Sequence, residues 1–136
     1  MSGSAEQVVA SVRSILGGDP GDPPATAPTD DATPFVWDDA DGRMHLTVTE
    51  RGRTLDYYVT TDVADFTYRV AVVMAGAIAG RRVPLQSPAD RRELWRDQYE
   101  LLERLGAGIA ERWLGELRQT LIAAGRADDL DLLPRA

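Results

Sequence analysis

Residues 35–60 read FVWDDADGRMHLTVTERGRTLDYYVT, and this stretch decides the fold. Apolar and polar residues alternate along it, and two turn-forming clusters interrupt the alternation, which is typical of an antiparallel meander. A two-residue loop at Arg51-Gly52 places Glu50 opposite Arg53, and a second turn at Asp41-Gly42 closes the other hairpin. The sequence therefore predicts a three-stranded antiparallel sheet.

The two turns together predict which side chains share a face of this sheet. On the predicted apolar face, Met44, Leu46 and Val48 lie opposite Val59, Tyr57 and Leu55, and Trp37 and Phe35 lie opposite Leu46 and Val48. The other face is mostly polar, so we expect it to be solvated or to form an interface. It carries Val36, Asp38, His45, Thr47, Thr49, Asp56, Tyr58 and Thr60.

Helical periodicity flanks the meander on both sides. Residues 4–16 have apolar side chains at helical spacing before Gly17. Residues 63–79 are apolar nearly all round, which is typical of a buried core helix, and Asp62 is placed to cap it. Two further helices are expected from Ser87, where Asp90 completes a capping box, and over residues 108–124. Trp95 and Trp113 are expected in the core.

This order of elements predicts an α+β fold: an N-terminal helix, a three-stranded antiparallel meander, then three helices packed on one sheet face. We expect a single domain made of an N-terminal helix (1–17), a Pro/Asp-rich linker (18–34) and an α+β core (35–136). The linker holds five Pro with several Asp and Thr between residues 19 and 34, a composition that predicts flexibility. Residues 128–133 are expected to dock as a short segment.

Acidic residues are concentrated in one part of the chain. Residues 18–66 contain eleven Asp/Glu and three Arg, a net charge of −8, whereas the remainder carries +1. A one-sided acidic field attracts a basic partner and raises its rate of association. The same negative charge repels phosphates, so we expect no nucleic-acid partner.

The residue types that are missing exclude several kinds of site. The chain has no Cys and no Lys, which excludes disulfides, thiolate metal sites and Schiff-base chemistry. No spacing of carboxylates around the single His predicts a metal site, and no glycine-rich phosphate loop is present, so we expect neither metal nor cofactor. The N-terminus shows no signal-peptide pattern, and the longest apolar run, 70–79, is short for a membrane span. We expect a cytoplasmic protein with no membrane partner.

His45 is the single candidate for a general base. The predicted register places Asp38 and Tyr58 across from it, which would orient an imidazole for proton transfer. A cross-strand row of polar residues on a solvated sheet face explains the same pattern, and we favour that interpretation. The Asp and Gly residues at positions 38–42 are likewise better explained as turn formers than as the start of a calcium loop. We therefore expect no catalytic residues.

The acidic stretch favours a protein-binding surface. Acids lie beside tyrosines on elements predicted to be ordered, a mixture suited to capturing a surface rich in Arg and Lys. The candidate partner-binding residues are Asp38, Asp39, Asp41, Glu50, Asp56, Tyr58, Asp62 and Asp65.

Residues 55–124 add a resemblance to this picture. Leu55-Asp56-Tyr57-Tyr58 leads into the buried helix, and an Arg-bearing loop then precedes residues 90–95, DRRELW, with Gln98 and later Trp113. This pattern resembles the immunity protein 63 family of bacterial polymorphic toxin systems. The resemblance implies a non-enzymatic inhibitor that protects the producing cell from a cognate toxin, usually encoded next to it and often directed at nucleic acid.

Two other functions remain open at this point. An acidic adaptor or secretion chaperone would hold an amphipathic segment of a partner through apolar contacts, so salt would change its affinity little. A small enzyme would use Asp38, His45 and Tyr58. We place the immunity function first and the enzyme last.

Overall fold

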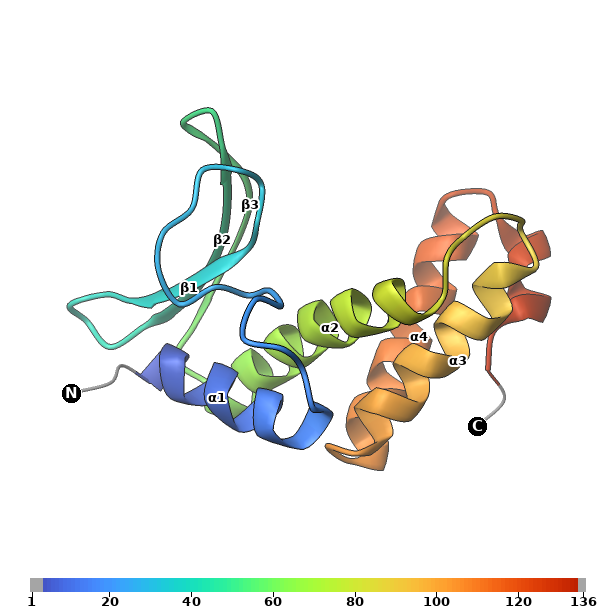
Figure 1. The fold of residues 1–136 in the computed structure, drawn as a ribbon, viewed down its shortest axis with the longest axis horizontal. Coiled ribbons are helices and arrows are strands. Elements are labelled where there is room, and N and C mark those ends of the chain that lie inside the picture. Colours follow the sequence, from blue (N-terminus) through green and yellow to red (C-terminus); the bar gives the residue numbers. More distant parts are fainter. Residues whose placement is uncertain (1–3, 135–136) are drawn as a thin grey trace. The chain divides into compact units, whose positions relative to one another are not determined.

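The computed structural model describes residues 4–134, with the backbone alone for residues 55–57. Its elements are α1 (Ser4–Leu16), β1 (Phe35–Asp38), β2 (Met44–Glu50), β3 (Arg53–Thr60), α2 (Val63–Arg82), α3 (Asp90–Glu103), α4 (Ala107–Ala123) and the 3-10 helix η1 (Ala127–Leu132). Figure 1 shows this order along the ribbon. The α+β class, the N-terminal helix and the antiparallel sheet in the order β1-β2-β3 are confirmed.

Backbone contacts divide the chain into two compact units. Unit 1 spans Met1–Met74 and holds the sheet, and unit 2 spans Ala75–Ala136 and holds the helical hairpin. The boundary falls inside α2, so this helix contributes side chains to both units. The packing of three helices on one sheet face stays a prediction; within unit 1, the helix that contacts β1 and β2 is α1.

The register of the sheet differs from the predicted one by one residue in both hairpins. Glu50 does lie opposite Arg53, but a bulge then shifts the pairing, so that Val48 lies opposite Asp56 and Leu46 opposite Tyr58. In the first hairpin Val36 lies opposite Leu46 and Trp37 opposite His45. Because a one-residue shift exchanges the two faces of a strand, the predicted apolar face is wrong.

Both faces of β2 are in fact covered. Met44, His45, Leu46 and Thr47 are all buried in succession. Val36 and Phe35 are buried on opposite faces of β1, whereas Trp37 remains 39% exposed. The solvated polar face that alternation predicted is therefore also wrong, since alternation identifies a one-sided sheet and this sheet is two-sided at its centre.

Helix α1 has the predicted bounds and buries one apolar stripe, made of Ala5, Val8, Val9, Val12 and Leu16. Its first turn is held by the sheet, because the backbone N–H of Ala5 donates to both carboxylate oxygens of Asp38, at 3.1 and 3.3 Å. A carboxylate at a helix N-terminus satisfies an otherwise unpaired N–H and complements the helix dipole. Gly17, with φ at +76°, ends the helix.

The linker makes ordered contacts with the rest of unit 1, which its composition did not predict. Asp22 and Pro24 are buried, and the Arg13 side chain donates to the backbone oxygen of Asp22 at 2.8 Å. Ala25 pairs with β1, and Ala32 donates its backbone N–H to Thr49 of β2. Composition missed this because the linker is held through its backbone and its short carboxylates, which need few large apolar side chains.

Helix α2 is the core helix that the sequence predicts. Its N-terminus is capped as expected, since Asp62 Oδ1 accepts the backbone N–H of Asp65 at 3.1 Å. Phe66, Val70 and Met74 are fully buried. The helix continues beyond Gly80 to Arg82, so by length and composition alone it could cross a membrane. This is weak evidence for a membrane span, because the core helix of a soluble protein passes the same test; 44% of the apolar window is buried inside the structure.

Unit 2 contains the hairpin of α3 and α4, which pack on each other as predicted, with η1 against both. Trp95 and Trp113 are buried, which confirms their core positions. Ile122, whose helical spacing from Trp113 and Leu114 favoured a buried position, is exposed. Asp90 Oδ2 accepts the backbone N–H groups of Gln86 and Ser87, as one half of the predicted capping box requires. These hydrogen bonds, Gln86 first, lower the pKa of Asp90. The predicted helix start at Ser87 is wrong, because α3 begins at Asp90 after Ala89, which makes no side-chain cap hydrogen bond.

Candidate partner-binding site

A single carboxylate builds the turn between β1 and β2. Asp39 Oδ1 accepts the backbone N–H groups of Asp41, at 2.9 Å, and Arg43, at 3.0 Å. Gly42 supplies a positive φ of +82°. Five residues, 39–43, therefore connect the strands, where the sequence predicted two, and this longer loop shifts the register of the first hairpin.

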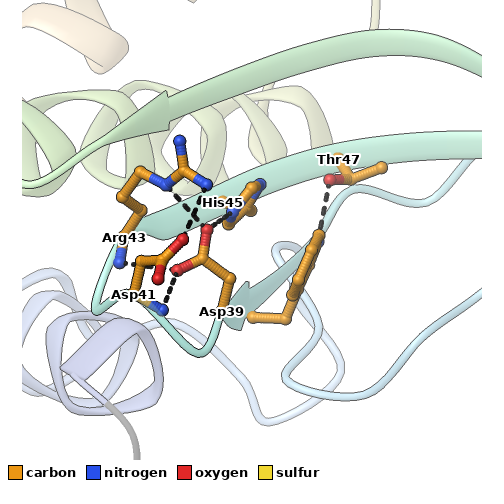
Figure 2. A network of polar contacts seen from close by, with 6 residues as sticks. Asp39, Asp41, Arg43, His45 and Thr47 are labelled. Atoms are coloured by element: carbon orange, nitrogen blue, oxygen red, sulfur yellow. Dashed lines mark hydrogen bonds and ion pairs between the residues drawn. The ribbon is translucent and has the colours of Figure 1, made fainter.

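The other oxygen of Asp39 joins the turn to the interior of the sheet. Asp39 Oδ2 lies 2.9 Å from Arg43 Nε and 2.8 Å from His45 Nε2, and Figure 2 shows the carboxylate between the two side chains. The hydrogen bond from His45, followed by that from the Arg43 backbone, lowers the pKa of Asp39 far below its usual value. An ionised carboxylate only accepts, so His45 Nε2 carries a proton.

Trp37 completes this network. Its indole stacks on the His45 imidazole with ring centroids 3.8 Å apart and 16° between the planes. Its Nε1 donates to Thr47 Oγ1 at 3.1 Å. Trp37 was predicted to be in the core, whereas the structure leaves it 39% exposed on the edge strand β1.

The catalytic arrangement that a small enzyme would need around His45 is not formed. The predicted partners of His45 are wrong: Asp38 caps α1, and Tyr58 lies under the Arg69 guanidinium, 4.8 Å from the ring centroid. His45 is only 4% exposed, so a substrate has little access to the imidazole. Among the residues whose side chains the structure describes, no group of three or more His, Asp or Glu could hold a metal ion.

The eight predicted binding residues have different surroundings. Asp41, Glu50 and Asp62 are exposed, at the two turns of the sheet and at the start of α2. Asp65 and Tyr58 are half-buried, and the side chain of Asp56 lies outside the described residues. Asp38 and Asp39 are half-buried and already bind backbone groups of this chain. The structure thus brings Asp39 and Asp41 into one network, whereas Glu50 lies at the opposite end of β2.

Unit 2 contains a groove that the sequence did not predict. Its volume is about 470 Å³, and it lies between α3 and the segment after η1. Arg92 and Arg96 line it and pair with no acid in the part of the chain that the structure describes. Other arginines nearby are paired, Arg82 with Asp97 at 3.1 Å, for example. The remaining lining residues are Tyr99, Glu100, Glu103, Leu132, Leu133 and Pro134.

The comparison with family models identifies the larger part of this chain. The model described as Immunity protein 63 matches residues 40–119, from the β1–β2 turn through β2, β3, α2 and α3 into α4. The match begins earlier than the expected resemblance over residues 55–124 and includes Asp41, Arg43 and His45. No curated protein and no solved structure matches. Since the model covers more than half of the 136 residues, the chain belongs to the immunity protein 63 family.

Proposed function

We propose that this protein binds a cognate bacterial toxin domain and neutralises it without catalysing a reaction. The observation that carries the proposal is the family match over residues 40–119. The surroundings of the single His support the absence of catalysis, because His45 is buried and holds the turn carboxylate. The site of action would be the cytoplasm of the producing cell.

The distribution of charge favours a basic, nucleic-acid-targeting toxin. Unit 1 has twelve Asp/Glu and five Arg, a net charge of −7, whereas unit 2 has ten of each. An enzyme that acts on nucleic acid has a basic groove for phosphates, and an acidic surface can occlude that groove after fast, steered association. The exposed carboxylates of Asp41, Glu50 and Asp62 are the proposed contacts, with Asp65, Tyr58 and Asp56 beside them in the chain.

Asp38 and Asp39 have a different place in this proposal. Asp38 holds the N-terminus of α1, and Asp39 holds the β1–β2 turn. We therefore propose that Asp38 and Asp39 hold the interface in shape and do not contact the partner, because their oxygens bind groups of this chain. Their negative charge still contributes to the electrostatic field of unit 1. Substituting either residue would disturb the fold as well as binding.

Co-expression tests the proposed function directly. The toxin domain encoded beside this chain is expressed alone, with this chain, and with a non-cognate immunity protein of similar net charge. We expect this chain, but not the non-cognate immunity protein, to restore growth, and we expect this chain and the toxin domain to purify as a complex. Persistent toxicity with both proteins present and no complex would rule the proposal out.

The groove in unit 2 keeps an adaptor function as the second candidate. Its apolar wall of Leu132, Leu133 and Pro134 could hold an amphipathic segment of a client protein. A client held there would bind with an affinity that changes little with salt and would be lost in Leu132→Glu. A toxin steered by unit 1 would show the reverse behaviour, with strong salt dependence and no effect of Leu132→Glu.

A further inference from the structure

Trp37 is exposed although its chemistry favours burial. Its exposed fraction is 39%, whereas Trp95 and Trp113 are 8% and 7% exposed. Tryptophan is enriched in the central contacts of protein interfaces, where its large ring leaves water on binding. An exposed Trp in the acidic unit is therefore a candidate anchor for a partner.

The orientation of this ring is already fixed. One face lies on His45, and the indole N–H is bound to Thr47. His45 is in turn held by Asp39, and Asp39 by the backbone of the turn (Figure 2). A partner that binds Trp37 therefore meets an ordered side chain, which removes most of the entropic cost of immobilising it.

The ring presents its uncovered surface in a negative environment. The Asp39 carboxylate binds the same imidazole on which Trp37 stacks, so the turn carboxylate lies near the indole. The turn beside the ring has two carboxylates, Asp39 and Asp41, for one guanidinium, Arg43. The face of an indole attracts cations more strongly than that of any other side chain. The Trp37 indole face and the negative charge of the turn thus both favour binding of a cationic group.

We propose that Trp37 is the anchor that receives an arginine side chain of the partner, stacked on the indole face opposite His45. This inference rests on the proposed function for the identity of the partner, but not for the capture of arginine itself. Trp37 precedes the matched residues 40–119, so it lies outside the part of the chain that the family model covers. The anchor would thereby set which partner this chain accepts.

The capture of arginine is tested first with a hexa-arginine peptide. The three indole N–H signals are followed by NMR as the peptide is added, with hexaglutamate as the control. We expect the Trp37 signal to move while those of Trp95 and Trp113 stay. Trp37→Leu, which keeps an apolar side chain but lacks the ring, should weaken peptide binding about two- to fivefold.

Unchanged Trp95 and Trp113 signals verify that Trp37→Leu is folded. Should that variant fail to fold, Trp37→Phe replaces it; this variant keeps a weaker aromatic face and is expected to bind hexa-arginine more weakly than the wild-type protein. A Trp37 signal that does not move in the wild-type protein, or equal peptide affinity with and without the ring, would overturn the inference.

The cognate toxin domain supplies the second measurement. We expect Trp37→Leu to weaken the complex at least tenfold, as for a central interface residue. The matched control is Ile15→Ala, an exposed apolar residue of the same unit (48% exposed), which should change affinity little. A wild-type protein that does not bind the toxin would refute the proposed function and leave the hexa-arginine result standing. Toxin binding that is equal in wild type and Trp37→Leu would refute the anchor alone.

Discussion

The two units of this chain differ in net charge. Unit 1 carries the whole net charge of −7, and unit 2 carries equal numbers of acids and arginines. In the described residues, the buried polar side chains Asp22, His45 and Thr47 all belong to unit 1. The sheet unit therefore combines a polar interior with an acidic exterior, whereas the helical unit has an apolar interior around Trp95 and Trp113.

This difference in net charge suits the two units to different kinds of interaction, one of long range and one of short range. A long-range field attracts a charged partner, and its sign and strength follow from net charge. A balanced surface has little such field and is suited to short-range contacts. We infer that unit 1 recognises the partner, and the predictions below test how far the two units differ.

The largest expected effect is on stability and should be similar in both units. Phe66 in unit 1 and Leu102 in unit 2 are both fully buried. Phe66→Ala should lower the free energy of unfolding by about 3–5 kcal/mol and Leu102→Ala by about 2–5 kcal/mol, through lost burial and the cavity left behind. Urea unfolding measures both. A loss below about 1 kcal/mol in either variant would show that its unit lacks the packed core described above.

Removing His45 should affect unit 1 alone. His45→Ala deletes the support of Trp37 and one donor to Asp39, at an expected cost of about 1–3 kcal/mol in unfolding free energy. The Trp37 indole signal should shift towards that of a mobile side chain, while the Trp95 signal stays. Unchanged stability and an unchanged Trp37 signal would contradict the network of Figure 2.

The stability of unit 1 should depend on pH through Asp39. The folded pKa of Asp39 is depressed below its usual 3.8, so its contribution is fully present above about pH 4 and is lost as pH falls through the folded pKa. Asp39→Asn should therefore be less stable than wild type at neutral pH, and the difference should shrink in strong acid. Parallel stability curves down to pH 2 would contradict this linkage.

The smallest expected effect is a titration in unit 2. Tyr99 donates its phenolic O–H to Glu111, and this hydrogen bond, with burial, raises the pKa of Tyr99 to about 12. Glu111→Gln should return that pKa towards 10, as followed by phenolate absorbance, with Tyr99→Phe to assign the signal. An identical titration in Glu111→Gln would exclude Glu111 as the cause.

Local sequence rules predicted much of the fold. The bounds of α1, the Glu50–Arg53 hairpin and the cap at Asp62 each depend on a few neighbouring residues, and all three are confirmed. The register depended on the length of the β1–β2 loop and, in the second hairpin, on the bulge between Val48 and Thr49. Asp39 reaches forward to bind the backbone of Arg43, so the loop is longer than the Asp41-Gly42 pair alone predicts.

The candidate site was predicted less well because it depends on that register. Trp37 is exposed, His45 is buried, and the partner of the imidazole is Asp39 in place of Asp38. The linker was missed for a related reason, since its contacts with β1 and β2 are made by the backbone and have no side-chain pattern. A sequence signal did exist at Asp39, because Asp commonly organises a turn by accepting N–H groups two residues ahead.

The central claim, that unit 1 steers the partner, is tested most directly by association rates. Asp41→Arg with Glu50→Arg reverses two exposed charges of unit 1, and Glu100→Arg with Glu103→Arg makes the same change in charge in unit 2. Rates with the cognate toxin domain are measured by stopped flow at low and high salt. We predict that the unit 1 variant associates about tenfold more slowly at low salt, that the unit 2 variant stays close to wild type, and that salt abolishes the difference. Equal slowing by the two variants would contradict the claim.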